Sequence, residues 1–109
     1  MRPAPRVPMT SKERAALRAE AHHLSPAVHM GHQGVTPSLI QSLDDALRTR
    51  ELVKVQFNKN AGEKPKEVAN RLAAQLGADV VQVIGRTATL YRENPELERK
   101  PGAPPPWRA

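Results

Sequence analysis

The chain has 109 residues, and its 17 Lys and Arg against 11 Asp and Glu give a formal net charge of +6 at pH 7. This length, with proline-rich ends, leaves room for one domain of about 90 residues and hardly for two. The absence of cysteine excludes disulfides, thiolate metal sites and cysteine nucleophiles. The basic excess favours a polyanionic partner, although a basic surface that serves only solubility gives the same count.

The N-terminal segment 1–9 has two arginines and three prolines but no apolar core of the kind a signal peptide needs. No stretch of the chain approaches the length needed to span a bilayer. We therefore expect a cytoplasmic protein that makes no membrane contact, with segment 1–9 disordered.

The first helix is predicted to begin at Thr10, because Thr10 and Glu13 match a capping box. Apolar residues continue at helical spacing: Leu17, Ala21 and Leu24. The dipeptide Ser25-Pro26 is expected to stop the helix there. Basic side chains lie largely off the apolar stripe: Lys12, Arg14 and Arg18. One face of this helix therefore belongs to the core and another is basic.

A short apolar strand, Ala27–Met30, leads into a Gly-x-x-Gly loop formed by Gly31, His32, Gln33 and Gly34. Thr36 can cap the helix that follows, and Pro37 suits its first turn. Free N–H groups and the positive end of the helix dipole favour an anion such as a phosphate. KH-type domains clamp a nucleic-acid backbone with such a loop. The alternative is a plain turn in which the glycines only make the bend.

Apolar spacing predicts the next three elements. Leucines at every fourth position predict an amphipathic second helix: Leu39, Leu43 and Leu47. Asp44 and Asp45 make it the least basic element. The alternation in Leu52–Phe57 predicts a strand with one buried face. A third helix over 66–76 is expected to end at Gly77.

Basic residues concentrate between positions 48 and 66, where six basic and two acidic residues give a local charge of +4. We take three lysines of this segment as candidate contacts: Lys54, Lys59 and Lys64. The alternative is a solvated loop and strand face with ordinary lysines.

A β-hairpin is predicted over 80–92, where Gly85 suits the first position of a type II′ turn and Arg86 lies at the tip. Segment 93–109 has five prolines and one Trp and is expected to be a flexible tail. The resulting order is α-β-α-β-α-β-β. It predicts a small α/β sandwich over residues 10–92, with one four-stranded mixed sheet packed with helices.

Four blocks of the chain resemble, in order, the bacterial YhbY family, which is the stand-alone form of the CRM domain (chloroplast RNA splicing and ribosome maturation). They are segments 21–26, 31–36, 51–55 and 81–92. The resemblance implies an α/β fold similar to the C-terminal domain of translation initiation factor three. It also implies RNA binding and an association with precursors of the large ribosomal subunit. Gly31 and Gly34 match the family's loop glycines, and Lys54 and Arg86 match its basic positions.

Other chemistry is disfavoured by the residue pattern. Adjacent His22 and His23 point about 100° apart on a helix, and no thiol or carboxylate ligand recurs near them at a metal-site spacing. No nucleophile with a base, P-loop or dinucleotide motif occurs. We therefore expect a monomeric, non-catalytic protein with no cofactor and no small-molecule substrate.

Our primary hypothesis is an RNA-binding protein that grips large-subunit rRNA or its assembly precursor. The loop would receive a phosphate. Seven basic residues would supply flanking charge if they share a face: Lys12, Arg14, Arg18, Lys54, Lys59, Lys64 and Arg86. The alternative is a protein-interaction module that docks an acidic partner through its basic face and its Pro-Trp tail.

Overall fold

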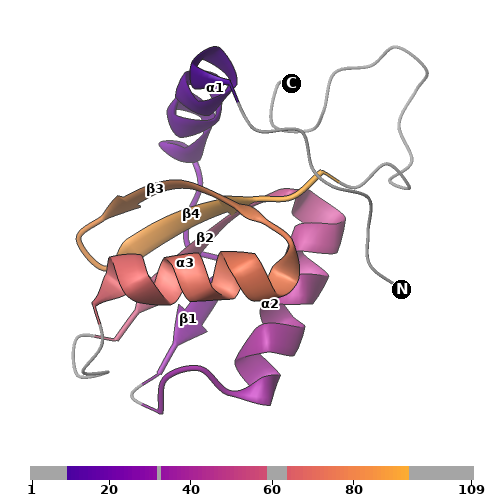
Figure 1. The fold of residues 1–109 in the computed structure, drawn as a ribbon, viewed down its shortest axis with the longest axis vertical. Coiled ribbons are helices and arrows are strands. Elements are labelled where there is room, and N and C mark those ends of the chain that lie inside the picture. The colour runs from indigo at the N-terminus through magenta and orange to yellow at the C-terminus, as the bar shows by residue number, and fades with distance from the viewer. Residues whose placement is uncertain (1–9, 32, 59–63, 94–109) are drawn as a thin grey trace.

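The computed structural model describes residues 10–31, 33–58 and 64–93. The elements follow in the order α1 (Ser11–Ala21), β1 (Val28–Met30), α2 (Pro37–Arg50), β2 (Leu52–Phe57), α3 (Pro65–Leu76), β3 (Asp79–Ile84) and β4 (Thr87–Tyr91) (Figure 1). The predicted order and the α/β fold are confirmed. The predictions for 1–9, for the Pro-rich tail after residue 93, and for His32 and Lys59 lie outside the described residues.

The four strands form one mixed sheet in the order β1-β2-β4-β3. β1 pairs with β2 in parallel, whereas β4 is antiparallel to both β2 and β3. Helix α2 makes the crossover that a parallel pair requires. β1 and β3 are the edge strands, and β4 lies between two strands that precede it in the chain.

Helices cover both faces of the sheet. Val53 and Val55 belong to the larger apolar core, which β2 forms with α2 and α3. Leu52 instead packs with Leu17 and Ala21 of α1. Because successive side chains of a strand point to opposite faces, α1 lies on the face opposite α2 and α3 (Figure 1).

Helix α1 begins as predicted but ends early. Both halves of the Thr10–Glu13 capping box are present. The helix ends at Ala21, however, so the prediction that it continues to Leu24 was wrong. The chain must leave α1 to reach the sheet edge, where Ala27 N donates to Lys54 O at 3.0 Å. Pro26 also disfavours a helical conformation just before it, and Leu24 is left 38% exposed.

Two tight connections position the ends of the strands. Glu51 alone separates α2 from β2; it is buried and has φ +64°, a strained conformation for a residue with a side chain.

The second connection is the β3–β4 turn, in which Gly85 has φ +58°. Among the described residues, Glu51 is the only non-glycine with positive φ. Arg86 therefore has negative φ, which agrees with the type II′ turn predicted from the sequence.

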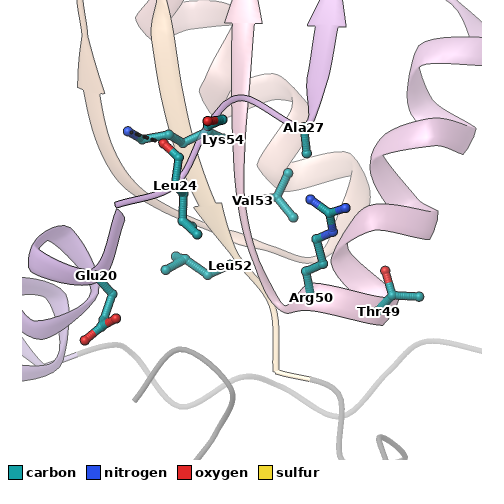
Figure 2. A pocket seen from close by; sticks show the side chains of 9 residues that line it. Glu20, Leu24, Ala27, Thr49, Arg50, Leu52, Val53 and Lys54 are labelled. Carbon is teal, nitrogen blue, oxygen red and sulfur yellow. Dashed lines mark hydrogen bonds between the residues drawn. The ribbon is translucent and has the colours of Figure 1, made fainter. Parts of the chain in front are cut away.

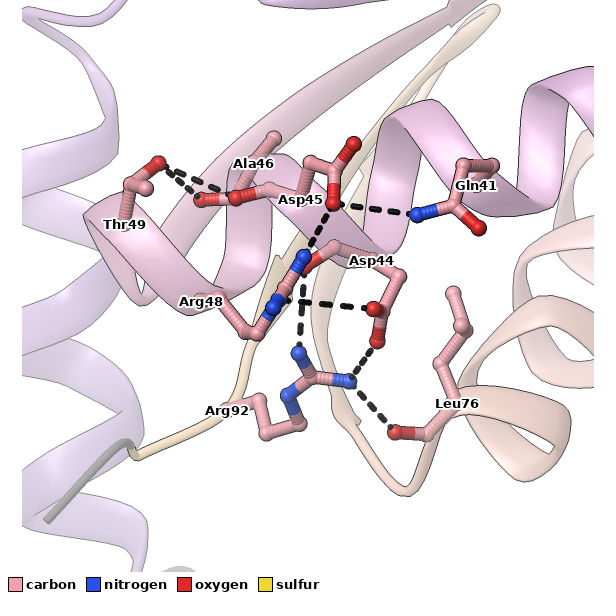
Figure 3. Close-up of polar contacts among 8 residues, drawn as sticks. All are labelled: Gln41, Asp44, Asp45, Ala46, Arg48, Thr49, Leu76 and Arg92. Atoms are coloured by element: carbon pink, nitrogen blue, oxygen red, sulfur yellow. Dashed lines mark hydrogen bonds and ion pairs between the residues drawn. The ribbon is translucent and has the colours of Figure 1, made fainter. Parts of the chain in front are cut away.

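Arg92 ties the end of β4 to two helices (Figure 3). Its Nη1 donates to Asp44 Oδ1 at 2.9 Å and to the Leu76 carbonyl at 3.0 Å, and its Nη2 donates to the Asp44 carbonyl at 3.2 Å. Arg48 also pairs with Asp44, at 3.5 Å, and with Asp45, but its side chain is 59% exposed. The two aspartates of α2 therefore balance arginines nearby, and only the Arg92 side chain, 18% exposed, is well covered.

We predict that Arg92→Met lowers the free energy of unfolding by about 2 kcal/mol, because it removes the donor to Asp44 Oδ1 and to the Leu76 carbonyl and leaves the half-buried carboxylate with only the exposed Arg48 as a partner. Arg48→Met removes the same charge from an exposed pair and should cost less than about 1 kcal/mol. Urea unfolding at neutral pH compares the two variants. Equal losses would show that the Arg92 contacts add nothing beyond surface charge.

Candidate nucleic-acid interface

The glycine loop connects β1 to α2 with a tight turn. Gly34 N donates to Gly31 O at 3.0 Å, and Gly34 has φ +77°. Thr36 then caps α2, since its Oγ1 accepts from Leu39 N at 3.1 Å, and Pro37 occupies the first turn. The predicted unit of strand, loop and capped helix is therefore confirmed.

The loop offers fewer free amides than its four residues suggest. The Gly34 N–H is already used within the turn. The N–H groups of Gln33, Val35 and Ser38 have no acceptor among the described residues. Ser38 is in the first turn of α2, where the helix dipole favours an anion. These three amides, rather than that of Gly34, are available to a phosphate.

The loop shares one end of the sheet with two of the predicted basic residues. Asn58 N donates to Met30 O at 3.0 Å, and Phe57 N donates to Arg86 O at 2.7 Å, so the ends of β1 and β2 meet the β3–β4 turn. Arg86 is exposed there, and exposed Lys64 precedes α3 at the same end (Figure 1). We call this the loop end of the sheet.

The other predicted basic residues that the structure describes lie elsewhere. Three belong to α1, on the opposite face: Lys12, Arg14 and Arg18. Arg14 Nη1 donates to the Val80 carbonyl at 3.1 Å, so its charge is held against the edge of β3. Lys54 also faces the α1 side, and its Nζ donates to the Leu24 carbonyl at 3.1 Å. The structure thus places Lys64 and Arg86 at the same end of the sheet as the glycine loop, but not the α1 residues or Lys54.

A groove of about 470 Å³ lies where the glycine loop meets β1 and α2. Its walls include both loop glycines and the polar residues His29, Gln33, Thr36, Ser38 and Ser42. None of its lining residues carries a carboxylate or a cationic Lys or Arg. Sequence reasoning missed this groove, although Ser38 and Ser42 stand one helical turn apart and so share a face of α2. We call it the loop groove.

No group of three or more His, Asp or Glu in the described segments is placed to hold a metal ion. None of the three described helices is long and apolar enough to cross a bilayer. The loop end and its groove remain the principal candidate site.

The fold and this site define a small α/β domain in which a glycine loop joins an edge strand to a capped helix. The family model of the CRS1 / YhbY (CRM) domain matches residues 9–92. The chain belongs to this family, and the resemblance inferred from its four sequence blocks is confirmed.

Similar proteins come from several bacteria. The chain is 39% identical over 88 residues to the probable RNA-binding protein YqeI of Bacillus subtilis, an alignment that covers 81% of this chain and 92% of YqeI. It is 32% identical over 90 residues to an RNA-binding protein of Haemophilus influenzae, an alignment that covers 83% of this chain and 91% of that protein. The solution structure of the hypothetical protein SAV1595 from Staphylococcus aureus superposes with a TM-score of 0.71 at 36% identity, covering 83% of this chain and 94% of that one.

The two loop glycines should respond differently to an added methyl group. A Cβ at either position meets no atom within 4 Å, but only Gly34 has positive φ. We predict that Gly34→Ala destabilises the fold by about 1 kcal/mol or more, whereas Gly31→Ala is nearly neutral. Urea unfolding measures both variants, and equal effects would contradict the loop conformation described here.

Proposed function

We propose that this protein is a non-catalytic RNA-binding protein that receives the RNA backbone at the loop end of the sheet. The observation that carries the proposal is the convergence of the glycine loop, the start of α2, Lys64 and Arg86 at one end of the sheet. The free amides and these cations fit a phosphodiester backbone, which carries one negative charge per nucleotide. The names of its relatives as RNA-binding proteins support the same ligand class.

The target that fits the family resemblance is rRNA of the large ribosomal subunit or its assembly precursor. We propose that the protein acts there as a monomer in the cytoplasm. The net charge of +6 supports a polyanionic partner. Backbone and shape should dominate recognition, because only three aromatic residues occur in the whole chain and a stacking platform needs several.

We predict that Gly34→Asp abolishes most RNA binding while Gly34→Asn keeps it. Both side chains tolerate a left-handed backbone conformation and have nearly the same shape. Only Asp adds a negative charge beside the proposed phosphate. Crosslinking in cells that make the protein naturally, followed by sequencing of the attached RNA, should give large-subunit rRNA for the wild type and Gly34→Asn. Gly34→Asp should lose these crosslinks.

Urea unfolding of the two variants serves as the control, because both must be folded for the comparison to count. Crosslinks spread over mRNA and small RNAs would contradict the ribosomal role but keep RNA binding. Equal crosslinking of folded Gly34→Asp and Gly34→Asn would show that the loop is only a bend. No crosslinks above background for the wild type would contradict the function itself.

A further inference from the structure

A second pocket lies beside the loop groove. It has a volume of about 290 Å³ and lies between the ends of α1 and α2 and the start of β2. Figure 2 shows Arg50 extending from the end of α2, with its guanidinium directed toward the segment that carries Ala27. Ala27 lines both this pocket and the loop groove. The two hollows are therefore neighbours along β1, and together we call them the β1 groove.

The outer edge of β1 is open to this groove. Among the described strands, β1 pairs with β2 alone. The Met30 carbonyl accepts from Asn58 N, so the backbone groups of Met30 face β2. Successive residues of a strand direct their N–H and C=O groups to opposite edges. His29 therefore presents a donor and an adjacent acceptor to the open edge, and His29 lines the groove.

The opposite wall carries hydroxyl groups, and the far end of the groove is lined by Arg50, Lys54 and Glu20, which leaves it one positive charge in excess. Hydroxyl side chains of α2 line the opposite wall: Ser38, Ser42 and Thr49. Arg50 has no ion-pair partner among the described residues, unlike Arg48 two positions earlier. The single residue Glu51 between α2 and β2 fixes where Arg50 leaves the helix. A ligand that enters at the glycine loop thus passes hydroxyls and backbone polar groups before it meets the Arg50 guanidinium.

We propose that the β1 groove holds a short run of single-stranded RNA that extends from the glycine loop to Arg50. The proposal rests on the function proposed above and names the form of RNA that the site accepts. One phosphate lies at the loop, a base edge faces the His29 backbone, and a further phosphate meets Arg50. The strand from Ala27 to Gly31 covers about 13 Å at ~3.3 Å per residue, which accommodates more than one nucleotide.

The hydrogen-bonding groups explain why the RNA must be unpaired. A base offers adjacent donors and acceptors on its Watson–Crick edge, and these groups are free only outside a duplex. Neither hollow is lined by Phe, Tyr or Trp, so the His29 imidazole is the one ring among the lining residues on which a base can stack. An extended peptide also binds open strand edges, but β1 offers only three residues, and Arg50, which has no ion-pair partner in the described segments, favours an anionic chain.

Two substitutions test the groove, each with a matched control on the same helix. Ser42→Tyr fills the groove, and Gln41→Tyr places the same bulk on a neighbouring exposed position that does not line it. Arg50→Gln removes one of the two cations that line the groove, and Arg48→Gln removes the same charge outside it. The probe is a fluorescein-labelled RNA of eight unpaired nucleotides of mixed sequence, and a fully paired duplex of equal length is the comparison. Fluorescence anisotropy at physiological salt gives the affinities.

We expect Arg50→Gln to weaken binding of the unpaired RNA about tenfold, the size of one lost charged hydrogen bond. Ser42→Tyr should weaken it by at least as much, because the added ring occupies the space of the RNA. Each control should change the affinity less than about twofold, the scale of a screened surface charge. The wild type should prefer the unpaired probe to the duplex. Urea unfolding of all four variants confirms that a weakened variant is folded.

Groove variants that bind like their controls would overturn the groove, as would equal losses in Arg50→Gln and Arg48→Gln. If Gly34→Asp still loses binding in either case, the proposed function stands and only the path of the RNA is wrong. If the wild type binds neither probe, both the groove and the proposed function are overturned.

Discussion

The parallel pairing of β1 with β2 is the constraint on which the candidate site depends. Val28 pairs with Val55 and Met30 with Phe57, so the buried side chains of both strands enter the same core. A shift of one residue would move His29 into that core and expose its neighbours. The pairing therefore fixes where the glycine loop begins and which edge of β1 stays open. Helix α2 completes the unit, because its capped start follows the loop directly.

Local chemistry made most of the fold predictable. The capping box at Thr10, the Thr36-Pro37 helix start and the Gly85 turn each involve residues close in sequence, so each was visible without coordinates. The end of α1 at Ala21 could not be predicted in this way. Leu24 has the spacing of a helix residue, but the chain must leave the helix before it in order to reach the sheet edge. The insertion of β4 between β2 and β3 also depends on packing between distant segments.

The distribution of charge was the least predictable part of the site. The local excess of +4 over positions 48–66 suggested one basic patch, yet the described members of this segment have different partners and do not form a single patch. Arg48 pairs with two aspartates of its own helix, and Lys54 bonds to a carbonyl on the α1 side. Arg50 and Lys54 both line the far end of the β1 groove, whereas Lys64 lies at the loop end. Sequence spacing gives the number of charges, but the partners of each cation appear only in three dimensions. Arg50 belongs to the basic segment 48–66, but the sequence did not indicate that it lines the groove.

The central claim is that RNA binds the glycine loop and the open edge of β1, and a nitrogen-15 heteronuclear NMR titration with unpaired RNA tests it most directly. The account predicts that the largest amide shifts fall on His29, Gly31, Gly34 and Arg50 and that they saturate together. Shifts concentrated on α1 would instead show that the basic face of that helix binds the RNA, and would contradict the site described here.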